Sequence, residues 1–518
     1  MQSELQLRTD PATAYTPQKL ETAVCRKLGI APERLGGAAV VRRSIDARQR
    51  TVMVNVTVRA YVDEPMPAHP NHEPVEYTPV EADSRQCVVV GAGPAGLFAA
   101  LRLIELGIRP IVLERGKDVD SRRADMAQIA RKSIVNPDSN YCFGEGGAGA
   151  YSDGKLFTRS KKRGNVGKIL NILHQHGAQE NILSDAHPHI GSDRLPEVIK
   201  AIRKTIIRCG GEVRFSTKVT DLTIDGDTVR GVVTADDERF DGPVILATGH
   251  SARDVYDMLH RSGVRLEAKG IAVGVRLEHP QHLIDCIRYH NPKGRGPYLP
   301  AAEYTMLTRV DGRAVYSFCM CPGGVIIPAA SAPGEMVVNG MSASARGSRW
   351  ANSGMVVEVL PEDVPGESPL RMIQYQENIE KAFFEESQGR QNAPAQRMAD
   401  FVDGRQSDSL PPTSYAPGIH PARVDRLLPA EISSRLRRGF EEFGRKNRGF
   451  LTNEAIVLGD ETRTSSPVRI PRDPETLSHT GVYGLFPCGE GAGYAGGIAS
   501  AAMDGERCAD AVAAYLRR

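Results

Sequence analysis

Three glycines in the first half of the chain have the types and spacing that phosphate binding requires. Gly91, Gly93 and Gly96 follow the apolar run at residues 87–90 and precede apolar residues at helical spacing. In this pattern the first glycine permits a tight turn, the second lets the backbone approach a pyrophosphate, and the third lets the helix pack closely on the strand. The N–H groups of the helix N-terminus then point at the phosphates. The alternative is a glycine-rich turn without a ligand.

An acidic residue completes the pattern. A second apolar run, residues 111–113, ends in Glu114, which lies 23 positions after Gly91. At this place a carboxylate can accept hydrogen bonds from the hydroxyls of an adenosine ribose. The strand, the helix, the second strand and the acid together favour dinucleotide binding over a turn that serves only the fold.

A second glycine-rich segment, residues 140–163, carries five glycines together with Asp153 and Lys155. Glycine backbone can approach a flat, polar ligand without Cβ clashes. Three aromatic residues are interleaved with the glycines, which favours an ordered loop packed over a ring system: Tyr141, Phe143 and Tyr151. The alternative is a flexible surface loop.

Two further segments point to the same chemistry. An apolar run at residues 244–247 ends in Thr248 and Gly249, where small residues would let the backbone meet the nucleotide again. Near the C-terminus, five glycines between residues 489 and 497 follow a short strand and precede a helix that begins near Ile498. The positive end of that helix would face an acceptor, for a flavin the N1–C2 oxygen edge where negative charge collects on reduction. The alternative is a small-residue helix that only packs.

Two other motifs are candidates for chemistry. Cys319 and Cys321 form a C-x-C pair, whose side chains we expect to diverge. We therefore expect packing or a single reactive thiol at Cys321 rather than a disulfide. Arg463 either pairs with a substrate carboxylate in a bidentate fork or holds its own loop in place.

The overall composition excludes several classes of protein. The chain has 518 residues, enough for two or three domains, and its 65 Lys and Arg against 63 Asp and Glu do not favour a polyanionic partner. Nine scattered cysteines without a C-x-x-C pair suit reduced thiols. The first residues are polar, unlike a signal peptide, and no apolar run approaches the ~20 residues of a spanning helix. We expect a cytoplasmic protein without a membrane or nucleic-acid partner.

The motifs together resemble a known group of proteins. The GAGPAG turn with Glu114, the strand that ends in ATG and the glycine-rich C-terminal helix resemble the FAD-binding domain of the glutathione-reductase-like (two-dinucleotide-binding-type) flavoprotein superfamily. Four segments are similar to the bacterial family of uncharacterised FAD-dependent dehydrogenases: GEGGAGAYSDGKL, FCMCPGG, NGMSASAR and ETRTSSPVRI. The resemblance implies FAD as cofactor, with NAD(P)H as a transient electron donor.

The resemblance also implies the architecture. The expected fold is α/β: a Rossmann-like FAD-binding domain split by an inserted α+β substrate domain, with a small N-terminal α+β domain. We expect the N-terminal domain and linker at residues 1–82, the two parts of the FAD-binding domain at 83–253 and 451–518, and the insert at 254–450. The missing second G-x-G-x-x-G argues against a dedicated NAD(P)H domain, and the missing C-x-x-C argues against a dithiol relay of the glutathione-reductase type.

The FAD contacts of the family can be carried onto this sequence. The pyrophosphate would lie at Gly91, Gly93, Pro94, Ala95 and Gly96. Glu114 would bind the adenosine ribose beside Arg115, and the nucleotide would also meet Val219, Ala247, Thr248 and Gly249. The flavin and ribityl chain would meet Gly146, Gly147, Ala148, Gly149, Asp153, Gly154, Lys155, Gly489, Glu490, Gly496, Gly497 and Ile498. Glu490 stands where most of the superfamily has Asp.

The expected activity is that of an FAD-dependent oxidoreductase or dehydrogenase. A hydride would pass between an unidentified small molecule, or NAD(P)H, and flavin N5, and the protein would orient and tune the flavin. The candidate catalytic residues are Lys155, Arg463 and Cys321. Two alternatives stay open: a tRNA-modifying flavoprotein, to which the near-neutral charge gives little support, and a non-catalytic flavin-bound redox sensor. The sequence leaves the substrate and the oligomeric state open.

Overall fold

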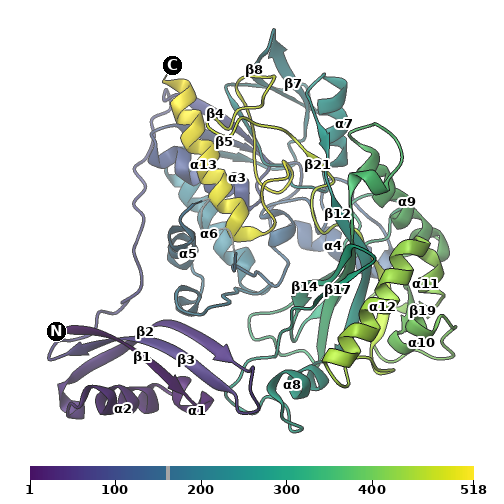
Figure 1. Ribbon diagram of the computed structural model, residues 1–518. Coiled ribbons are helices and arrows are strands. Elements are labelled where there is room, and N and C mark those ends of the chain that lie inside the picture. The colour runs from purple at the N-terminus through teal and green to yellow at the C-terminus, as the bar shows by residue number, and fades with distance from the viewer. Residues whose placement is uncertain (159–163, 518) are drawn as a thin grey trace.

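The computed structural model describes residues 1–158 and 164–517, so the end of the predicted loop at residues 140–163 lies outside the described residues. Four sheets of three or more strands organise the described residues: one parallel, one mixed and two small antiparallel sheets, one of them near the N-terminus. Figure 1 shows the N-terminal sheet set apart from the rest and joined to it by an extended segment.

The parallel sheet is built from the short apolar runs of the sequence. Its order is β22-β10-β4-β5-β6, and every neighbouring pair is parallel. Both faces are covered, which is why these runs are continuously apolar rather than alternating. The strands are β4 (Gln86–Val90), β5 (Arg109–Leu113), β6 (Glu212–Arg214), β10 (Val244–Leu246) and β22 (Leu485–Pro487). The predicted strands at these places are confirmed.

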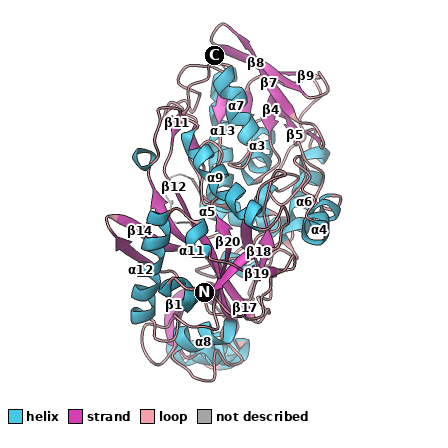
Figure 2. Ribbon diagram, turned by 90° about the vertical axis from the view of Figure 1, so that its right-hand side faces the viewer, coloured by secondary structure: helices cyan, strands magenta, loops and turns pink. Residues whose placement is uncertain are grey.

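Helices cover one face of this sheet, and they include the last helix of the chain. They are α3 (Pro94–Glu105), α5 (Val166–Gln175), α6 (Leu195–Arg208) and α13 (Ile498–Leu516), with α4 (Arg122–Lys132) nearby. Helices α3 and α13 lie side by side in both views (Figures 1 and 2). Their backbones approach so closely that a Cβ on Gly505 of α13 would lie 2.1 Å from the carbonyl oxygen of Ala95 in α3. The end of the chain therefore completes a domain that begins at β4.

The other face carries a small antiparallel sheet, with β7 (Val219–Asp225), β8 (Thr228–Thr234) and β9 (Arg239–Asp241), and the helix α7 (Arg253–Arg261). Val88, Val90, Ile111 and Leu113 of the parallel strands join this second core, whereas Cys87, Val89 and Val112 join the helical one. This alternation along β4 and β5 is what a strand buried on both faces requires.

A seven-stranded sheet, of order β13-β14-β17-β12-β20-β18-β19, forms the core of the insert. It contains β12 (Ile271–Pro280), β13 (Leu307–Val310), β14 (Arg313–Cys321), β17 (Trp350–Val359), β18 (Ala393–Arg397), β19 (Ile419–Pro421) and β20 (Ile456–Glu461). Because β20 pairs with both β12 and β18, this sheet extends beyond the expected boundary at residue 450.

The insert's remaining elements surround this sheet. The helices are α8 (Gln281–Tyr289), α9 (Arg371–Glu386), α10 (Met398–Asp403), α11 (Val424–Leu427) and α12 (Ala430–Lys446), and a two-stranded sheet pairs β15 (Val325–Pro328) with β16 (Val338–Met341). Where the chain enters and leaves the insert, β11 (Glu267–Ala268) pairs with β21 (Val468–Arg469), so the two crossings run side by side.

The N-terminal domain is a three-stranded antiparallel sheet on two helices. Its strands are β1 (Gln2–Thr9), β2 (Leu35–Asp46) and β3 (Met53–Val62), in the order β1-β3-β2, and its helices are α1 (Pro11–Ala14) and α2 (Pro17–Leu28). Strand β1 pairs antiparallel with β3 along its whole length. Arg43 of β2 donates two hydrogen bonds to Asp185, at 3.0 and 2.9 Å, which attaches this domain to the body of the protein.

The architecture is α/β, as predicted: a Rossmann-like domain split by an inserted domain and preceded by a small α+β domain. Across residues 1–158 and 164–517, no helix combines the length and the apolar character needed to cross a membrane.

Candidate active site

A cavity of about 380 Å³, here called the nucleotide cavity, opens at the carboxyl ends of β4, β5 and β10. The crevice outside the carboxyl ends of parallel strands is where open α/β sheets bind ligands. The N-termini of α3 and α13 reach the same cavity, although more than 390 residues separate Gly93 from Gly497. The fold therefore brings the distant glycine-rich segments together.

Most of the predicted FAD contacts line the nucleotide cavity. They are Gly91, Gly93, Pro94, Ala95, Glu114, Arg115, Gly147, Ala148, Gly149, Asp153, Gly154, Lys155, Val219, Ala247, Thr248, Gly249, Glu490, Gly496, Gly497 and Ile498.

Three predicted contacts lie behind the cavity wall: Gly96, Gly146 and Gly489. A Cβ on Gly96 would lie 1.9 Å from the carbonyl oxygen of Gly91, and a Cβ on Gly146 would lie 2.4 Å from the Cδ1 of Ile199. A Cβ on Gly489 would lie 2.8 Å from that of Ala95. These glycines permit close packing of the elements that shape the cavity, instead of lining it themselves.

The two helix N-termini are open to a ligand. Their N-cap residues, Gly93 and Gly497, offer no side chain to the first-turn N–H groups, which have no partners within the helix. A Cβ on Gly93 would have only the Cα of Gly147 nearby, at 4.0 Å, and a Cβ on Gly496 or Gly497 would meet no atom within 4 Å. Space and unpaired donors therefore coincide, as an anionic ligand such as a pyrophosphate requires.

Glu114 occupies the end of β5 and fixes three turns at once. Its carboxylate accepts hydrogen bonds from the backbone N–H groups of Ala92 at 2.8 Å, and of Gly116 and Gly144 at 2.9 Å each. The side chain is only 5 % exposed yet reaches the cavity wall. The residue expected to bind the ribose is thus also the connection between the first and second glycine-rich segments.

Arg115 also lies at this wall, and its guanidinium is held by the protein itself. It donates hydrogen bonds to Asp138 and Asp254 at 2.7 and 2.8 Å and lies over the ring of Phe143, 4.2 Å from its centre. Phe143 and His250 line the cavity as well and were not among the predicted contacts.

Glu490 supplies a test of fit for the cofactor. Burial raises the pKa of its carboxyl to about 7, and no described residue donates a hydrogen bond to it. The residue is half-buried and faces the cavity, so a ligand that carries hydroxyl groups could donate hydrogen bonds to this carboxyl. The polyhydroxy ribityl chain of FAD fits this position, next to the N-terminus of α13.

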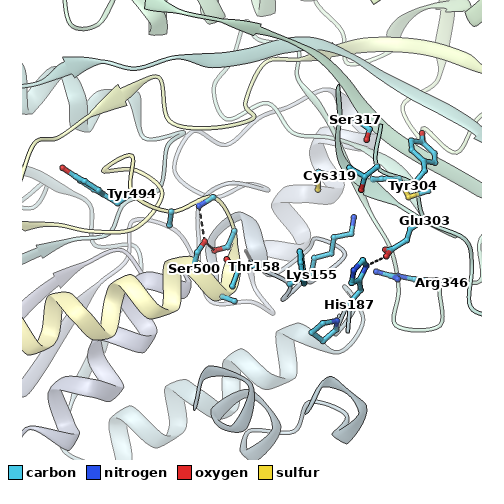
Figure 3. Close-up of a pocket in the computed structure, with 18 of the residues that line it drawn as sticks. Lys155, Thr158, His187, Glu303, Tyr304, Ser317, Cys319, Arg346, Tyr494 and Ser500 are labelled. Carbon is cyan, nitrogen blue, oxygen red and sulfur yellow. Dashed lines mark hydrogen bonds and ion pairs between the residues drawn. The ribbon is translucent and has the colours of Figure 1, made fainter. Parts of the chain in front are cut away.

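A second cavity of about 690 Å³, here called the insert-side cavity, adjoins the first. The two share Lys155, Phe157, Cys319, Gly496 and Gly497. Residues of the parallel-sheet domain line one side, and residues of the insert line the other (Figure 3). The site therefore has two compartments that meet beside the start of α13.

The charges of the insert-side cavity are paired, with one exception. Arg346 donates two hydrogen bonds to Asp153, at 3.1 and 2.5 Å, and His187 Nδ1 pairs with the carboxylate of Glu303. The His187–Glu303 pair raises the pKa of the imidazole, and it lowers the pKa of the carboxyl to about 2 against the opposing effect of burial.

Lys155 is the exception. Its ammonium has neither a hydrogen bond nor an ion pair with any residue in the described part of the chain, and it points to the side of the cavity that holds Cys319 and Glu303 (Figure 3). Since Lys155 also lines the nucleotide cavity, its ammonium lies where the two compartments meet.

The other two catalytic candidates are placed differently. Arg463 lines the nucleotide cavity, but its guanidinium donates to Glu380, Glu335 and Ser331, so the structure supports the alternative in which it holds its loop. Cys321 is buried and is not among the residues of either cavity, whereas Cys319 lines both. The expected divergence of the two cysteines is wrong: their side chains hydrogen-bond to each other, in a part of β14 where the register with β17 shifts.

Sequence reasoning missed His187 and Glu303 of the insert-side cavity, did not single out Arg346, and selected Cys321 as the reactive thiol in place of Cys319. They come from separate segments, and no local spacing relates them. Cys319 and Arg346 do lie in two of the segments that carry the family resemblance, FCMCPGG and NGMSASAR, which is the one signal that would have selected them.

Comparison with known families gives three matches along the chain. Residues 84–241 match the FAD binding domain family, and residues 270–464 match the family described as FAD-dependent protein, C-terminal domain-like. Residues 1–61 match a domain of unknown function. The second match ends at residue 464, close to the end of β20.

One relative spans almost the whole chain. An uncharacterized protein of Clostridium beijerinckii is 40% identical over 508 residues, which cover 95% of each chain. Among solved structures, CtdE in complex with FAD is 12% identical, covers 84% of this chain and 90% of its own, and has a TM-score of 0.32. The flavin-dependent brominase Bmp2 is 13% identical, covers 84% of this chain and 80% of its own, and has a TM-score of 0.36.

Proposed function

The chain belongs to the family of the Clostridium beijerinckii protein and contains an FAD-binding domain, and we propose that it is an oxidoreductase that exchanges two electrons between FAD and a small molecule. FAD is the cofactor. The glutathione-reductase-like superfamily, the dehydrogenase activity and NAD(P)H as electron donor are parts of this proposal.

The observation that carries the proposal is the junction of the two cavities. A ligand that extends from Glu114 past Gly93 to Gly497 would end where the insert-side cavity begins. A second molecule in that cavity would therefore meet the end of the cofactor that lies at α13. An FAD held with its adenosine at Glu114 would place its flavin at this junction, where flavin N5 exchanges a hydride with a substrate.

The side chains at the junction suit an anionic substrate. The Lys155 ammonium would bind a carboxylate or phosphate group, because the nearby Glu303 carboxylate is already paired with His187. His187, held by Glu303, would accept or supply the proton that accompanies hydride transfer. The surrounding insert would exclude water from the reacting groups.

An anaerobic reduction experiment tests this function. The purified holoenzyme is mixed with NADH, NADPH and a panel of small hydroxy and amino acids, and flavin absorbance is followed. We expect at least one donor to bleach the flavin. Lys155→Met should slow reduction by an anionic donor, whereas Lys204→Met, on the exposed face of α6, should leave the rate unchanged. A protein that binds no FAD, or a flavin that no donor reduces, would refute the proposal.

A further inference from the structure

The wall shared by the two cavities contains a cysteine in a strained backbone conformation. Cys319 in β14 has a φ of +43°, in the left-handed region that residues other than glycine rarely adopt. The register between β14 and β17 shifts between Phe318 and Cys321, which marks a β-bulge. Bulges of this kind re-aim a side chain, and strained residues concentrate at functional sites.

A second cysteine adjoins the first. The thiol of Cys321 lies 3.4 Å from the carbonyl oxygen of Cys319 and is also hydrogen-bonded to the Cys319 side chain. The Nη2 of Arg276 donates to the same carbonyl at 2.9 Å and to the sulfur of Cys321 at 3.5 Å. Two thiols therefore form one buried cluster, in which Cys319 opens to both cavities and Cys321 lies behind it.

Positive charge on two sides favours the reactive form of Cys319. Lys155 faces it from the second glycine-rich segment and Arg276 from β12. The acidic groups that oppose them are Asp153, Glu461 and Glu490. The hydrogen bond from Cys321, helped by the two positive charges, lowers the pKa of Cys319 to about 5 against the opposing effect of burial. A thiolate is the form of cysteine that attacks or gives up electrons, so Cys319 is in its reactive state near neutral pH.

We propose that Cys319 and Cys321 are a dithiol–disulfide couple that exchanges two electrons with the flavin of the proposed function. In the oxidising direction, the Cys319 thiolate and the Cys321 thiol lose two electrons and one proton as a single S–S bond forms. The oxidised flavin takes up both electrons and that proton. In the reverse direction the reduced flavin returns them, and the S–S bond breaks to give one thiolate and one thiol.

Two features separate this couple from the other cysteines. Cys319 is the cysteine that lines both cavities, and Cys321 is its hydrogen-bonded neighbour. Cys488 and Cys508 also hydrogen-bond to each other, but both are buried and neither lines either cavity. Cys142 also reaches the nucleotide cavity, but its thiol is directed to the carbonyl of Ala329 and has no second cysteine beside it. A reversible disulfide is therefore expected at the C-x-C pair alone.

Mass spectrometry of the holoenzyme tests the couple directly. The protein is treated anaerobically with a small organic disulfide, then alkylated, digested and analysed for the peptide that contains both cysteines. We expect this peptide to lose two hydrogens and to resist alkylation, and we expect the change to reverse after the flavin is reduced with dithionite. Cys319→Ser and Cys321→Ser should each abolish the change. Cys286→Ser, in α8 and outside both cavities, should leave it intact.

A reductive titration gives a second measurement. The pretreated wild type should consume one further two-electron equivalent per flavin compared with Cys319→Ser, which should take up only the equivalent for the flavin. Two alkylated cysteines after pretreatment, or equal consumption by wild type and variant, would overturn the inference. Since donors can still bleach the flavin in that case, failure of the couple is distinct from failure of the proposed function.

Discussion

Replacing Gly93 or Gly96 with alanine should separate binding of FAD from folding. Gly93 has ordinary extended angles, φ −76° and ψ −177°, and a Cβ there would have only the Cα of Gly147 nearby, at 4.0 Å. Alanine is a poorer N-cap than glycine by about 0.7 kcal/mol, and the lower entropy of the unfolded chain returns about 0.4–1 kcal/mol. The stability of the apoprotein should therefore change by less than about 0.5 kcal/mol.

The same methyl group should be costly when FAD is present, because it would occupy space between the α3 N-terminus and the pyrophosphate. Forcing a methyl group into a packed contact costs about 1–3 kcal/mol, so the dissociation constant for FAD should rise about 5- to 150-fold. At Gly96 the cost falls on the fold instead. Its Cβ would lie 1.9 Å from the carbonyl oxygen of Gly91 and 3.3 Å from the Cγ1 of Val89. We expect a loss of more than about 3 kcal/mol there, beyond the usual range for overpacking.

Two measurements on three proteins decide the matter: thermal melting of the apoproteins and titration of each with FAD, followed by quenching of flavin fluorescence. Because a protein with several domains need not unfold in one step, the relevant transition is the one whose midpoint FAD shifts. If Gly93→Ala lowered that midpoint as far as Gly96→Ala, or bound FAD as wild type does, the assignment of the α3 N-terminus as the pyrophosphate site would be wrong.

Three further outcomes are expected. Glu114→Gln keeps only one acceptor oxygen for the three backbone donors, so it should lower the free energy of unfolding of the apoprotein by about 2–4 kcal/mol. The control Glu238→Gln removes a carboxylate from an exposed ion pair and should lower it by less than about 1 kcal/mol. Thermal melting measures both effects. The pKa of Glu303 is lowered to about 2, and the pKa of His187 is raised. The melting temperature of wild type should therefore exceed that of Glu303→Gln, and this difference should be largest between pH 4.5 and pH 6.5, the ordinary pKa values of the two groups. That difference should decline as the pH rises through the raised pKa of His187 or falls towards 2; a difference that does not vary with pH would contradict it. Free FAD at a hundred times its dissociation constant should stabilise the apoprotein by about 2.7 kcal/mol, and an unshifted melting curve would count against the cavity assignment.

The nucleotide cavity could be predicted from the sequence because its signals are local. A strand, a glycine turn and a helix follow one another at residues 86–105, and each has a recognisable pattern of its own. The same holds at α13, whose start the glycines before Ile498 indicate. Even here the sequence does not separate glycines that face a ligand, such as Gly93, from glycines that face another element, such as Gly96, because both need the absence of a Cβ.

The insert-side cavity could not be predicted, because its polar residues meet only after the insert folds onto the parallel-sheet domain. His187 and Glu303 lie on separate segments, and so do Asp153 and Arg346. Arg463 shows a related difficulty. The sequence shows a charged residue in a distinctive segment, but only the structure shows that Glu380 and Glu335 form ion pairs with it. At Cys319 the bulge in β14 decides which thiol reaches the cavity, and no spacing rule describes a bulge.

The pairing of α3 with α13 has a consequence for how the protein is made. The ribosome releases α3 early, and the surface that α13 covers stays uncovered while the whole insert is being synthesised. Domains generally fold in the order of their emergence, so we expect the sheet of the insert to form first and FAD to bind only after α13 has emerged. We expect a polypeptide truncated before Ile498 to bind no FAD and to expose the apolar face of α3 that α13 covers. Such a chain would be a substrate for chaperones and proteases rather than a weaker enzyme.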